Sequence, residues 1–570
     1  MDRPEPGAQA PGDALAATCA SYWDWQLEES PIFATYLGIR RGLDRLDDAG
    51  PAARARREAR LQRFLLDVEA IAPDPLAPEE RITRSVLLRE LSEGIEAFRH
   101  HSWESALDQL GGPHIAVQDL MAVQPLSEPA DVEALLARLS DVPRFFQAHV
   151  GDLKDGIASG RTAARTSYER VLAQVQKVGA SPADKTSFAT AAARFPKAWP
   201  QAERTRLGRR LLETVEATVL PAYRTLGGFL EHNYAGKARP HPGIWSIPGG
   251  PEAYAFATRS HTTTTLSPDR IHQIGLEEVE KNEREMLEIA RAAGHGGELR
   301  EFLDTLGKDK RFRLATREQV LSRYREICAR MDKRLPEVFG RLPSTGYEVR
   351  ALEEYREKDA PAAYYLPPAE DGSRGGIFWA NTHAPESWPT YDMETLSFHE
   401  AVPGHHLQIA VARELSELPA IRRHAQFTAY VEGWAHYTER LADEMGAYST
   451  PFDRLGMLGG QAWRAARLVV DTGVHHLKWD RDKALHMLQR VRSGPPADVA
   501  NELDRYITWP GQALAYKIGQ RTFFEVRERA RRRLGARFSL KGFHDEALRH
   551  GALPLSILED AVRSWDPATP

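Results

Sequence analysis

The segment 399–405, with the sequence HEAVPGH, restricts the fold more than any other part of this 570-residue chain. In the common motif H-E-x-x-H, two metal-binding histidines lie four residues apart on one face of a helix. Here they lie six residues apart, and a regular helix would direct them to different sides. Pro403 lacks a backbone N–H, and Gly404 tolerates unusual dihedral angles. We therefore expect a local bulge that brings the two imidazoles together.

His406 is an alternative second ligand to His405. It follows His399 by seven residues, so an unbroken helix places these two histidines on the same face. A lone histidine in a helix is usually structural, but a His-Glu pair followed by a Gly-His pair favours a metal site. The sequence therefore predicts a site with His399 and one of the two later histidines as ligands.

A second helix is expected to supply the third ligand. The segment EGWAHYTERL begins with Glu432 and is aromatic and largely apolar around it. Two imidazoles and one carboxylate leave a fourth position for water, as in catalytic zinc sites. His436 and Glu439 follow four and seven residues later on the same face. There they orient the ligand imidazoles through hydrogen bonds or, alternatively, bind the metal themselves.

One zinc ion per chain is the expected cofactor, and manganese, cobalt or iron would fit the same ligands. A catalytic zinc site needs a carboxylate that takes a proton from the metal-bound water and passes it to the leaving amine. Glu400 directly follows His399. We therefore expect Glu400 to be the general base.

Helical periodicity dominates the chain on both sides of an irregular stretch at residues 241–265. Apolar residues recur three and four positions apart up to about residue 235, which predicts successive helices. The segment Ser267–Asp269 gives an N-cap, a first-turn proline and an acidic first turn, so a long helix should follow to about Ala293. The expected divisions are a disordered segment at 1–12, a helical N-terminal lobe at 13–240 and a metal-binding region at 241–570, interlocked or forming one domain.

Three short runs between residues 347 and 382 predict a small sheet directly before the metal-binding helix. YEVRAL, AAYYL and GGIFWANT are rich in β-branched or aromatic residues and are separated by Pro, Gly and Asp. An edge strand at GGIFWANT would let an extended peptide pair with it along the main chain. The candidate substrate contacts here are Phe378, Trp379, Asn381 and Tyr365, and for Tyr365 the alternative is a packing role in the sheet.

Arg464, Arg467, Asp471 and His475 follow one another at spacings of three, four and four, so they form one helical stripe. The stripe is either an exposed ladder of ion pairs or the wall of a cleft. Its apolar flanks favour the cleft wall. In that position an arginine binds a substrate carboxylate through paired hydrogen bonds, and His475 assists an oxyanion.

Charge and cysteine usage narrow the class of protein. The formal net charge is -5, and acidic and basic residues are interleaved, so nucleic acid is not expected as a partner. Two distant cysteines, Cys19 and Cys328, favour a reducing, cytoplasmic compartment. We see no signal-peptide core and no run of about twenty apolar residues, so we expect neither secretion nor a membrane span.

Four segments, FHEAVPGHHLQ, EGWAHYTERL, RLVVDTGVHHLKW and WPGQALAYKIG, resemble the domain-of-unknown-function 885 family in the same order. That family is similar to the helical gluzincin peptidases, the neighbourhood of angiotensin-converting enzyme, thimet oligopeptidase, dipeptidyl peptidase III and the Taq-type carboxypeptidases. The resemblance implies a mainly α, zincin-like fold: a two-lobed helical clamshell with a deep central channel, a zinc ion at its floor and one small β-sheet beside the metal-binding helix.

The resemblance also assigns residues. The Gly-His pair of those peptidases falls on Gly404 and His405, which favours His405 over His406, and their downstream metal-binding glutamate falls on Glu432. The gap before His405 is longer than in those peptidases. Their tyrosine-bearing segment is similar to WPGQALAYKIG, which makes Tyr516 the candidate oxyanion donor, or otherwise a packed aromatic residue, with Lys517 beside it as a candidate substrate contact.

Together these features predict a zinc-dependent peptidase that cleaves short peptides or peptide-like molecules in a channel closed to whole proteins. One alternative keeps the site but is a tailoring amidase acting on one pathway metabolite. Another is a non-enzymatic, metal-bound peptide-binding protein. The sequence leaves open the metabolite, the end of the peptide that is cleaved and the oligomeric state.

Overall fold

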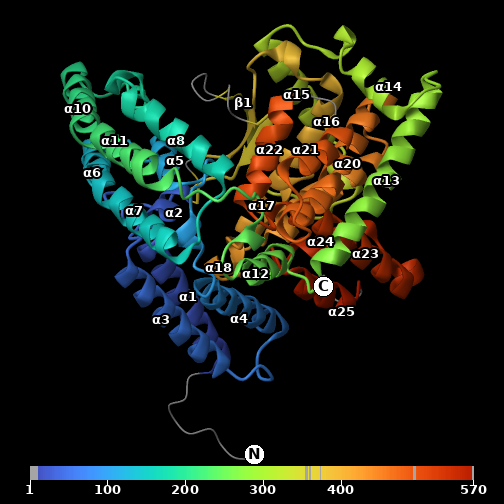
Figure 1. Cartoon of the computed structure of the whole chain (residues 1–570). Helices are drawn as coiled ribbons and strands as arrows, with labels where there is room; N and C mark the ends of the chain where they lie inside the picture. The colour runs from blue at the N-terminus through green and yellow to red at the C-terminus, as the bar shows by residue number, and fades with distance from the viewer. Residues whose placement is uncertain are drawn as a thin grey trace, which may run out of the picture. The chain divides into compact units, whose positions relative to one another are not determined.

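Helices make up most of the chain, and one three-stranded sheet interrupts them, as the sequence predicts (Figure 1). The computed structural model describes residues 10–352, 357, 361–370, 372, 374–491 and 496–567. The chain forms two compact units, Met1–Glu252 and Ala253–Pro570. Most of the segment predicted to be disordered, 1–12, lies outside the described residues, and the first helix begins at Pro11.

The first unit is helical throughout its described part, and many of its helices begin with a proline, which fits the first turn because no N–H is needed there. Its largest core cluster consists mainly of leucine, valine and aromatic side chains, and Leu27, Ala34 and Leu37 form a second, smaller cluster. The helices are α1 (Pro11–Glu29), α2 (Pro31–Tyr36), α3 (Pro51–Glu69), α4 (Pro78–Phe98), α5 (Pro113–Val123), α6 (Pro129–Ser140), α7 (Val142–Ser159), α8 (Arg165–Ala180), α9 (Thr190–Ala193), α10 (Gln201–Thr214) and α11 (Leu220–Phe229).

The second unit contains the segments that carry the predicted site. The helix expected from Ser267 is confirmed as α13, where the Ser267 side chain accepts a hydrogen bond from the backbone N–H of Arg270. The helices from the boundary onward are α12 (Gly250–Thr262), α13 (Pro268–Ala292), α14 (Leu299–Leu306), α15 (Arg317–Asp332), α16 (Met393–Glu400), α17 (His405–Arg413), α18 (Ala420–Arg423), α19 (Thr428–Glu444), α20 (Pro451–His475), α21 (Arg481–Val491), α22 (Pro496–Thr508), α23 (Ala515–Leu534), α24 (Leu540–Leu548) and α25 (Leu555–Ser564).

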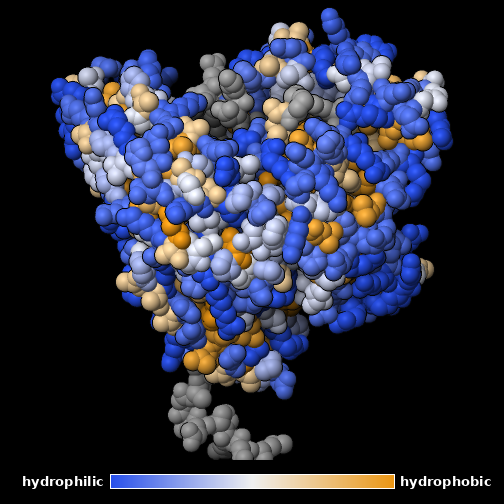
Figure 2. Space-filling view, in the orientation of Figure 1, coloured by the Kyte–Doolittle hydropathy of each residue, from blue (hydrophilic) through white to orange (hydrophobic). Residues whose placement is uncertain are grey.

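Apolar side chains gather inside each unit. Among the described residues, few large apolar side chains are exposed, and the face in Figure 2 is mainly hydrophilic. None of the described helices has the length and the apolar character that a bilayer crossing requires.

The small sheet consists of β1 (Tyr347–Ala351), β2 (Ala363–Leu366) and β3 (Gly376–Ala380) in the order β1-β3-β2. Strand β3 pairs in parallel with β1 and antiparallel with β2. The expectation that GGIFWANT forms an edge strand is therefore wrong. The near-continuous apolar run of β3 is buried on both faces, which is typical of a central strand. Both of its edges are already paired, so it has no free edge for a peptide.

Three predicted substrate contacts on this strand have other environments. Phe378 is fully buried and packs edge-on against Tyr324, with ring centroids 5.0 Å apart. The Asn381 amide donates to the carbonyl oxygen of Glu357 at 2.7 Å and holds the loop that follows β3. The contacts of these two residues give no support to the predicted role in substrate binding. Trp379 is half-buried and lies beside Tyr364, with ring centroids 6.4 Å apart.

Helices α19 and α23 approach each other unusually closely. A Cβ atom on Gly433 of α19 would lie 2.5 Å from the Cα atom of Gly519 on α23, and a Cβ atom on Gly519 would lie 1.9 Å from the carbonyl oxygen of Ala429. Trp434 then packs edge-on against Phe523, with centroids 5.4 Å apart. The two glycines thus let the backbones meet, and the contact places the start of α23 next to Glu432.

Gly433→Ala should therefore destabilise the second unit. The added methyl group would overlap the backbone of α23, and the two helices can separate only if their side chains repack. We therefore expect a loss of about 1–3 kcal/mol in the free energy of unfolding. Urea unfolding followed by circular dichroism measures this. The matched control is Gly459→Ala on α20, where the new methyl group has no neighbour within 4 Å; it should be neutral or stabilising by up to about 1 kcal/mol. Equal stability of both variants would contradict the packing argument.

Candidate metal centre

A four-residue break, 401–404, separates α16 from α17. Glycine is required at its end, because a Cβ atom on Gly404 would lie 1.9 Å from the carbonyl oxygen of His399. A hydrogen bond from α19 also stabilises the break, since the Trp434 indole N–H donates to the carbonyl oxygen of Pro403 at 3.0 Å. The predicted Pro-Gly bulge is confirmed, and it is tied to α19, which carries Glu432.

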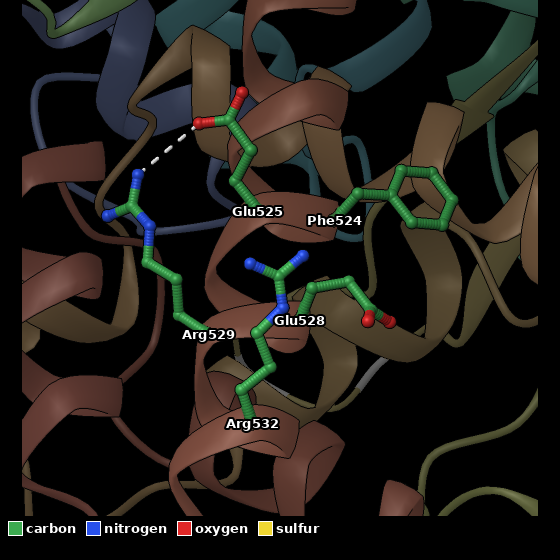
Figure 3. Close-up of a pocket in the computed structure, with 5 residues that line it drawn as sticks. All are labelled: Phe524, Glu525, Glu528, Arg529 and Arg532. Atoms are coloured by element: carbon green, nitrogen blue, oxygen red, sulfur yellow. Dashed lines mark hydrogen bonds and ion pairs between the residues drawn. The ribbon is translucent and has the colours of Figure 1, made fainter.

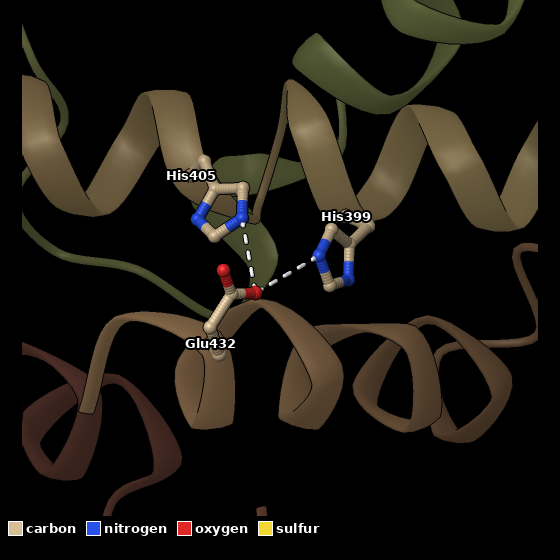
Figure 4. A group of neighbouring side chains, drawn as sticks. All are labelled: His399, His405 and Glu432. Atoms are coloured by element: carbon tan, nitrogen blue, oxygen red, sulfur yellow. Dashed lines mark ion pairs between the residues drawn. The ribbon is translucent and has the colours of Figure 1, made fainter. Parts of the chain in front are cut away.

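The break brings His399, His405 and Glu432 together (Figure 4). Glu432 Oε2 lies 3.5 Å from His399 Nε2 and 3.5 Å from His405 Nε2. The three candidate ligand atoms all lie within 4.8 Å of one another, and no other such group occurs among the residues that the structure describes.

The donor set fits a metal ion. Ligands at about 2.0–2.1 Å from a tetrahedral zinc ion lie about 3.4 Å from one another, close to the two N···O distances here. Those distances are longer than an ordinary hydrogen bond. Glu432 Oε2 is buried and has no hydrogen-bond partner in the described part of the chain. A buried carboxylate oxygen without a hydrogen bond is costly unless a cation completes the group.

His406 faces the sheet and not this cluster. Its Nδ1 lies 2.9 Å from the Tyr365 hydroxyl, and its ring lies 4.5 Å from that of Tyr347. The break turns α17 so that His405 points toward Glu432 and His406 points away. Of the two alternatives, the geometry favours His405. Tyr365, predicted as a substrate contact, packs between the sheet and α17 through His406.

Glu439 contacts two histidines, the candidate ligand His399 and His436. Its Oε1 accepts from His399 Nδ1 at 2.8 Å, and its Oε2 lies 3.0 Å from His436 Nδ1. The bond at Nδ1 directs the lone pair of His399 Nε2 toward the cluster. Glu439 therefore contacts a candidate ligand directly, as predicted for an orienting residue, whereas His436 contacts Glu439 and not an imidazole of the cluster.

Glu400 is the last residue of α16 and follows the candidate ligand His399 directly. Burial raises the pKa of its carboxyl group and the negative charge of Glu432 raises it further, while His399 and His405 oppose the shift. A carboxylate with a raised pKa beside a metal site is suited to accepting a proton.

Tyr516 lies in the first turn of α23, with the Arg467 guanidinium 4.5 Å from its ring centroid. Burial raises the pKa of the Tyr516 phenol, and the charge of Glu432 raises it further. Tyr516 is therefore within electrostatic reach of the cluster. Lys517, its neighbour, is 1% exposed and bonds to two glutamine side chains, contacts that give no support to its predicted role as a substrate contact.

In the predicted stripe on α20, Arg467, Asp471 and His475 are buried and Arg464 is half-buried, and all four have protein partners. Arg464 Nη2 lies 3.7 Å from Glu439 Oε1, and Arg467 donates to the hydroxyl of Tyr506. Asp471 accepts bonds from the Tyr254 hydroxyl at 2.7 Å and from the Gly511 N–H at 3.1 Å.

His475 Nε2 lies 2.9 Å from the carbonyl oxygen of Tyr506. The far end of the stripe, Asp471 and His475, therefore ties helices together and does not form an open wall. The described contacts of His475 do not include the metal cluster, so they give no support to a role at an oxyanion.

Sequence reasoning missed Gln461 and Trp434. Gln461 lies three residues before Arg464 on the same face of α20, and its amide donates to Glu439 Oε2 at 2.9 Å. The type of residue alone did not indicate a role for Gln461, because a glutamine is uncharged, although its spacing of three residues from Arg464 placed it on the same helical face. Trp434 stood inside the quoted motif, but its bond to Pro403 depends on the break.

A surface pocket on α23 contains none of the predicted catalytic or metal-binding residues (Figure 3). Phe524, Glu525, Glu528, Arg529 and Arg532 line it. The charged residues pair locally, as in the contact of 3.4 Å between Arg529 and Glu525. None of the predicted site residues lines this pocket.

A family model described as "Bacterial protein of unknown function (DUF885)" matches residues 31–562. The chain is also similar to the crystal structure of a candidate lipoprotein from Colwellia psychrerythraea: 28% identity, a TM-score of 0.93, and coverage of 98% of this chain and 99% of that chain. A candidate lipoprotein of unknown function from Shewanella oneidensis is 18% identical with a TM-score of 0.75, covers 96% of this chain and 100% of that chain, and shows the fold alone. Among curated proteins, none has a matching sequence.

Metal content tests the candidate ligands. We expect about one zinc per chain in the wild-type protein and in His406→Ala, and loss of metal in His405→Ala and Glu432→Ala, because only the latter two remove a converging ligand atom. Elemental analysis after dialysis in metal-replete buffer measures this. Metal retained in His405→Ala but lost in His406→Ala would move the second ligand by one residue.

Proposed function

The chain belongs to the bacterial DUF885 family, and we propose that it is a zinc-dependent hydrolase that cleaves amide bonds of short peptides or peptide-like molecules. The observation that carries the proposal is the convergence of His399, His405 and Glu432 with the carboxylate of Glu400 next to the first ligand. Two imidazoles and one carboxylate are the ligand set of many zinc hydrolases, and they leave a coordination position for water or substrate.

In the proposed reaction, these three residues would hold a zinc ion, which would supply the polarisation of the scissile carbonyl and a lowered pKa of the attacking water. Glu400 takes the proton of the attacking water and passes it to the leaving amine. Tyr516 donates a hydrogen bond from its phenol, which is protonated at neutral pH, to the developing oxyanion. Glu439 holds His399 in the required orientation.

The kinship with helical gluzincin peptidases is part of this proposal. It rests on the His-Glu pair, the Gly404-His405 pair and the downstream Glu432, which share the order of ligands of those enzymes. The same kinship implies the two-lobed clamshell with a central channel, in which short peptides reach the metal and folded proteins do not. A tailoring amidase would use the same residues, and a screen of substrates distinguishes the two activities.

The location of the protein is a separate part of the proposal. Cys19 and Cys328 are buried free thiols, which agrees with the predicted reducing, cytoplasmic compartment. The similar crystal structure from Colwellia psychrerythraea is of a candidate lipoprotein, which points instead to an anchored protein. Fractionation of cells that express the native gene separates these locations.

Glu400→Gln tests the general base. The amide keeps the shape of the side chain but cannot take a proton, so we expect cleavage of a mixed di- and tripeptide library to fall by at least about 100-fold with the metal retained. Chromatography of the digested library together with elemental analysis measures both. The matched control Glu417→Gln changes an exposed glutamate after α17 and should leave the rate unchanged. Full activity in Glu400→Gln would exclude this role.

Tyr516→Phe tests the oxyanion donor. Loss of one such donor lowers kcat by about 10²- to 10³-fold in enzymes of this chemistry, with a smaller effect on KM. Steady-state kinetics on the best substrate of the library measures the two constants. A change confined to KM would assign Tyr516 to substrate binding. The control is Tyr36→Phe, a partly exposed tyrosine in the first unit.

A further inference from the structure

A buried lysine lies behind the candidate metal centre. Lys517 is 1% exposed, and its ammonium group donates to Gln461 Oε1 at 2.8 Å and to Gln520 Oε1 at 2.7 Å. Its nearest carboxylate oxygen in the described chain is on Glu278, at 3.8 Å. Burying an ammonium group with mainly neutral partners costs free energy, so its position calls for a compensating role.

The lysine fixes the direction of both glutamine amides. In its ammonium form Lys517 only donates, so both amide oxygens then face it and both amide nitrogens point elsewhere. Gln520 Nε2 donates to Gln461 Oε1 and to the carbonyl oxygen of His436, each at 2.8 Å. Gln461 Nε2 donates to Glu439 Oε2 at 2.9 Å. The network therefore runs from α23 through α20 to α19, and Gln461 Nε2 also lies 3.2 Å from His436 Nδ1.

Glu439 connects the Gln461 amide to the candidate ligand His399. Its Oε2 is occupied by Gln461 and His436, and its Oε1 accepts from His399 Nδ1 at 2.8 Å. An ionised carboxylate only accepts, so His399 must carry its proton on Nδ1 and leave the lone pair on Nε2 for the cluster. If the Gln461 amide turned over, its oxygen would face the Glu439 carboxylate and repel it.

We propose that Lys517, acting through Gln461 and Glu439, is a positioning residue that holds His399 in its metal-binding tautomer. Its charge and donor bonds keep the Gln461 N–H aimed at Glu439. Arg464 supplies a second positive charge at 3.7 Å from Glu439, but on the other carboxylate oxygen. The inference rests on the metal site of the proposed function and is independent of the reaction performed there.

Zinc affinity of the full-length, metal-free protein tests the inference, with a chromophoric chelator as competitor. Lys517→Met keeps the length of the side chain and removes the donors, and Gln461→Met removes the bond to Glu439. We expect zinc to bind about 10- to 100-fold more weakly in each variant, as for other residues that orient metal ligands. The matched control Lys541→Met changes an exposed lysine on α24 and should bind zinc as the wild-type protein does.

A double-mutant cycle separates positioning from a general structural role. If Lys517 acts through Glu439, Lys517→Met should weaken zinc binding strongly in the wild-type background and by less than about twofold in Glu439→Gln. Additive effects would overturn the inference, as would wild-type zinc affinity in Lys517→Met. If Lys517→Met does not fold, as judged by circular dichroism, Gln461→Met takes its place in the cycle with the same expectation.

The outcomes also separate this inference from the proposed activity. Wild-type protein that binds zinc and shows the coupling but cleaves no amide would overturn the hydrolase and keep the positioning role. If the wild-type protein cleaves peptides but Lys517→Met binds zinc as tightly as the wild type, the hydrolase would stand and the positioning role would be overturned. Wild-type protein that binds no zinc would overturn both.

Discussion

The close approach of Gly404 to the carbonyl oxygen of His399 is the constraint on which the site depends. A side chain at this position would collide with the preceding turn, so only glycine allows α17 to begin where it does. The break selects which of two adjacent histidines faces Glu432. The indole of Trp434 then ties the break to α19, so the two ligand-bearing segments are held together before any ion is considered. The resulting geometry is largely a property of the backbone.

Helix α19 shows how the chain accommodates polar groups in its interior. It carries Glu432, His436 and Glu439 among residues that are almost all buried, and Glu439 accepts hydrogen bonds at both of its carboxylate oxygens. A satisfied network fixes side-chain orientation, whereas an unsatisfied polar group is costly. In the described chain, Glu432 Oε2 and His436 Nε2 are buried without a hydrogen bond. Of these two atoms, Glu432 Oε2 lies in the cluster with His399 and His405, where a cation would compensate for the missing bond.

The sequence predicted those parts of the molecule that depend on residue type and spacing. The helical class and the small sheet followed from periodicity, and a site with His399, Glu432 and either His405 or His406 followed from proline and glycine chemistry and the known ligand types. The preference for His405 came from the family resemblance. What it could not predict depended on the neighbours of a residue in space. Phe378 was assigned to an edge because strand order is a long-range property, and Lys517 was assigned to substrate because nothing in the sequence showed that two glutamines would enclose it.

The four-residue break between α16 and α17 also bears on how such centres are found in genomes. A pattern with fixed H-E-x-x-H spacing counts residues, whereas an ion responds only to distances between atoms. Here the extra residues are absorbed in a turn closed by glycine, and the imidazoles still meet. Distance along the chain is therefore free to vary where a turn compensates for it. Searches that allow a proline-glycine insertion between the two histidines, and that require a later glutamate, will recover centres that the shorter pattern overlooks.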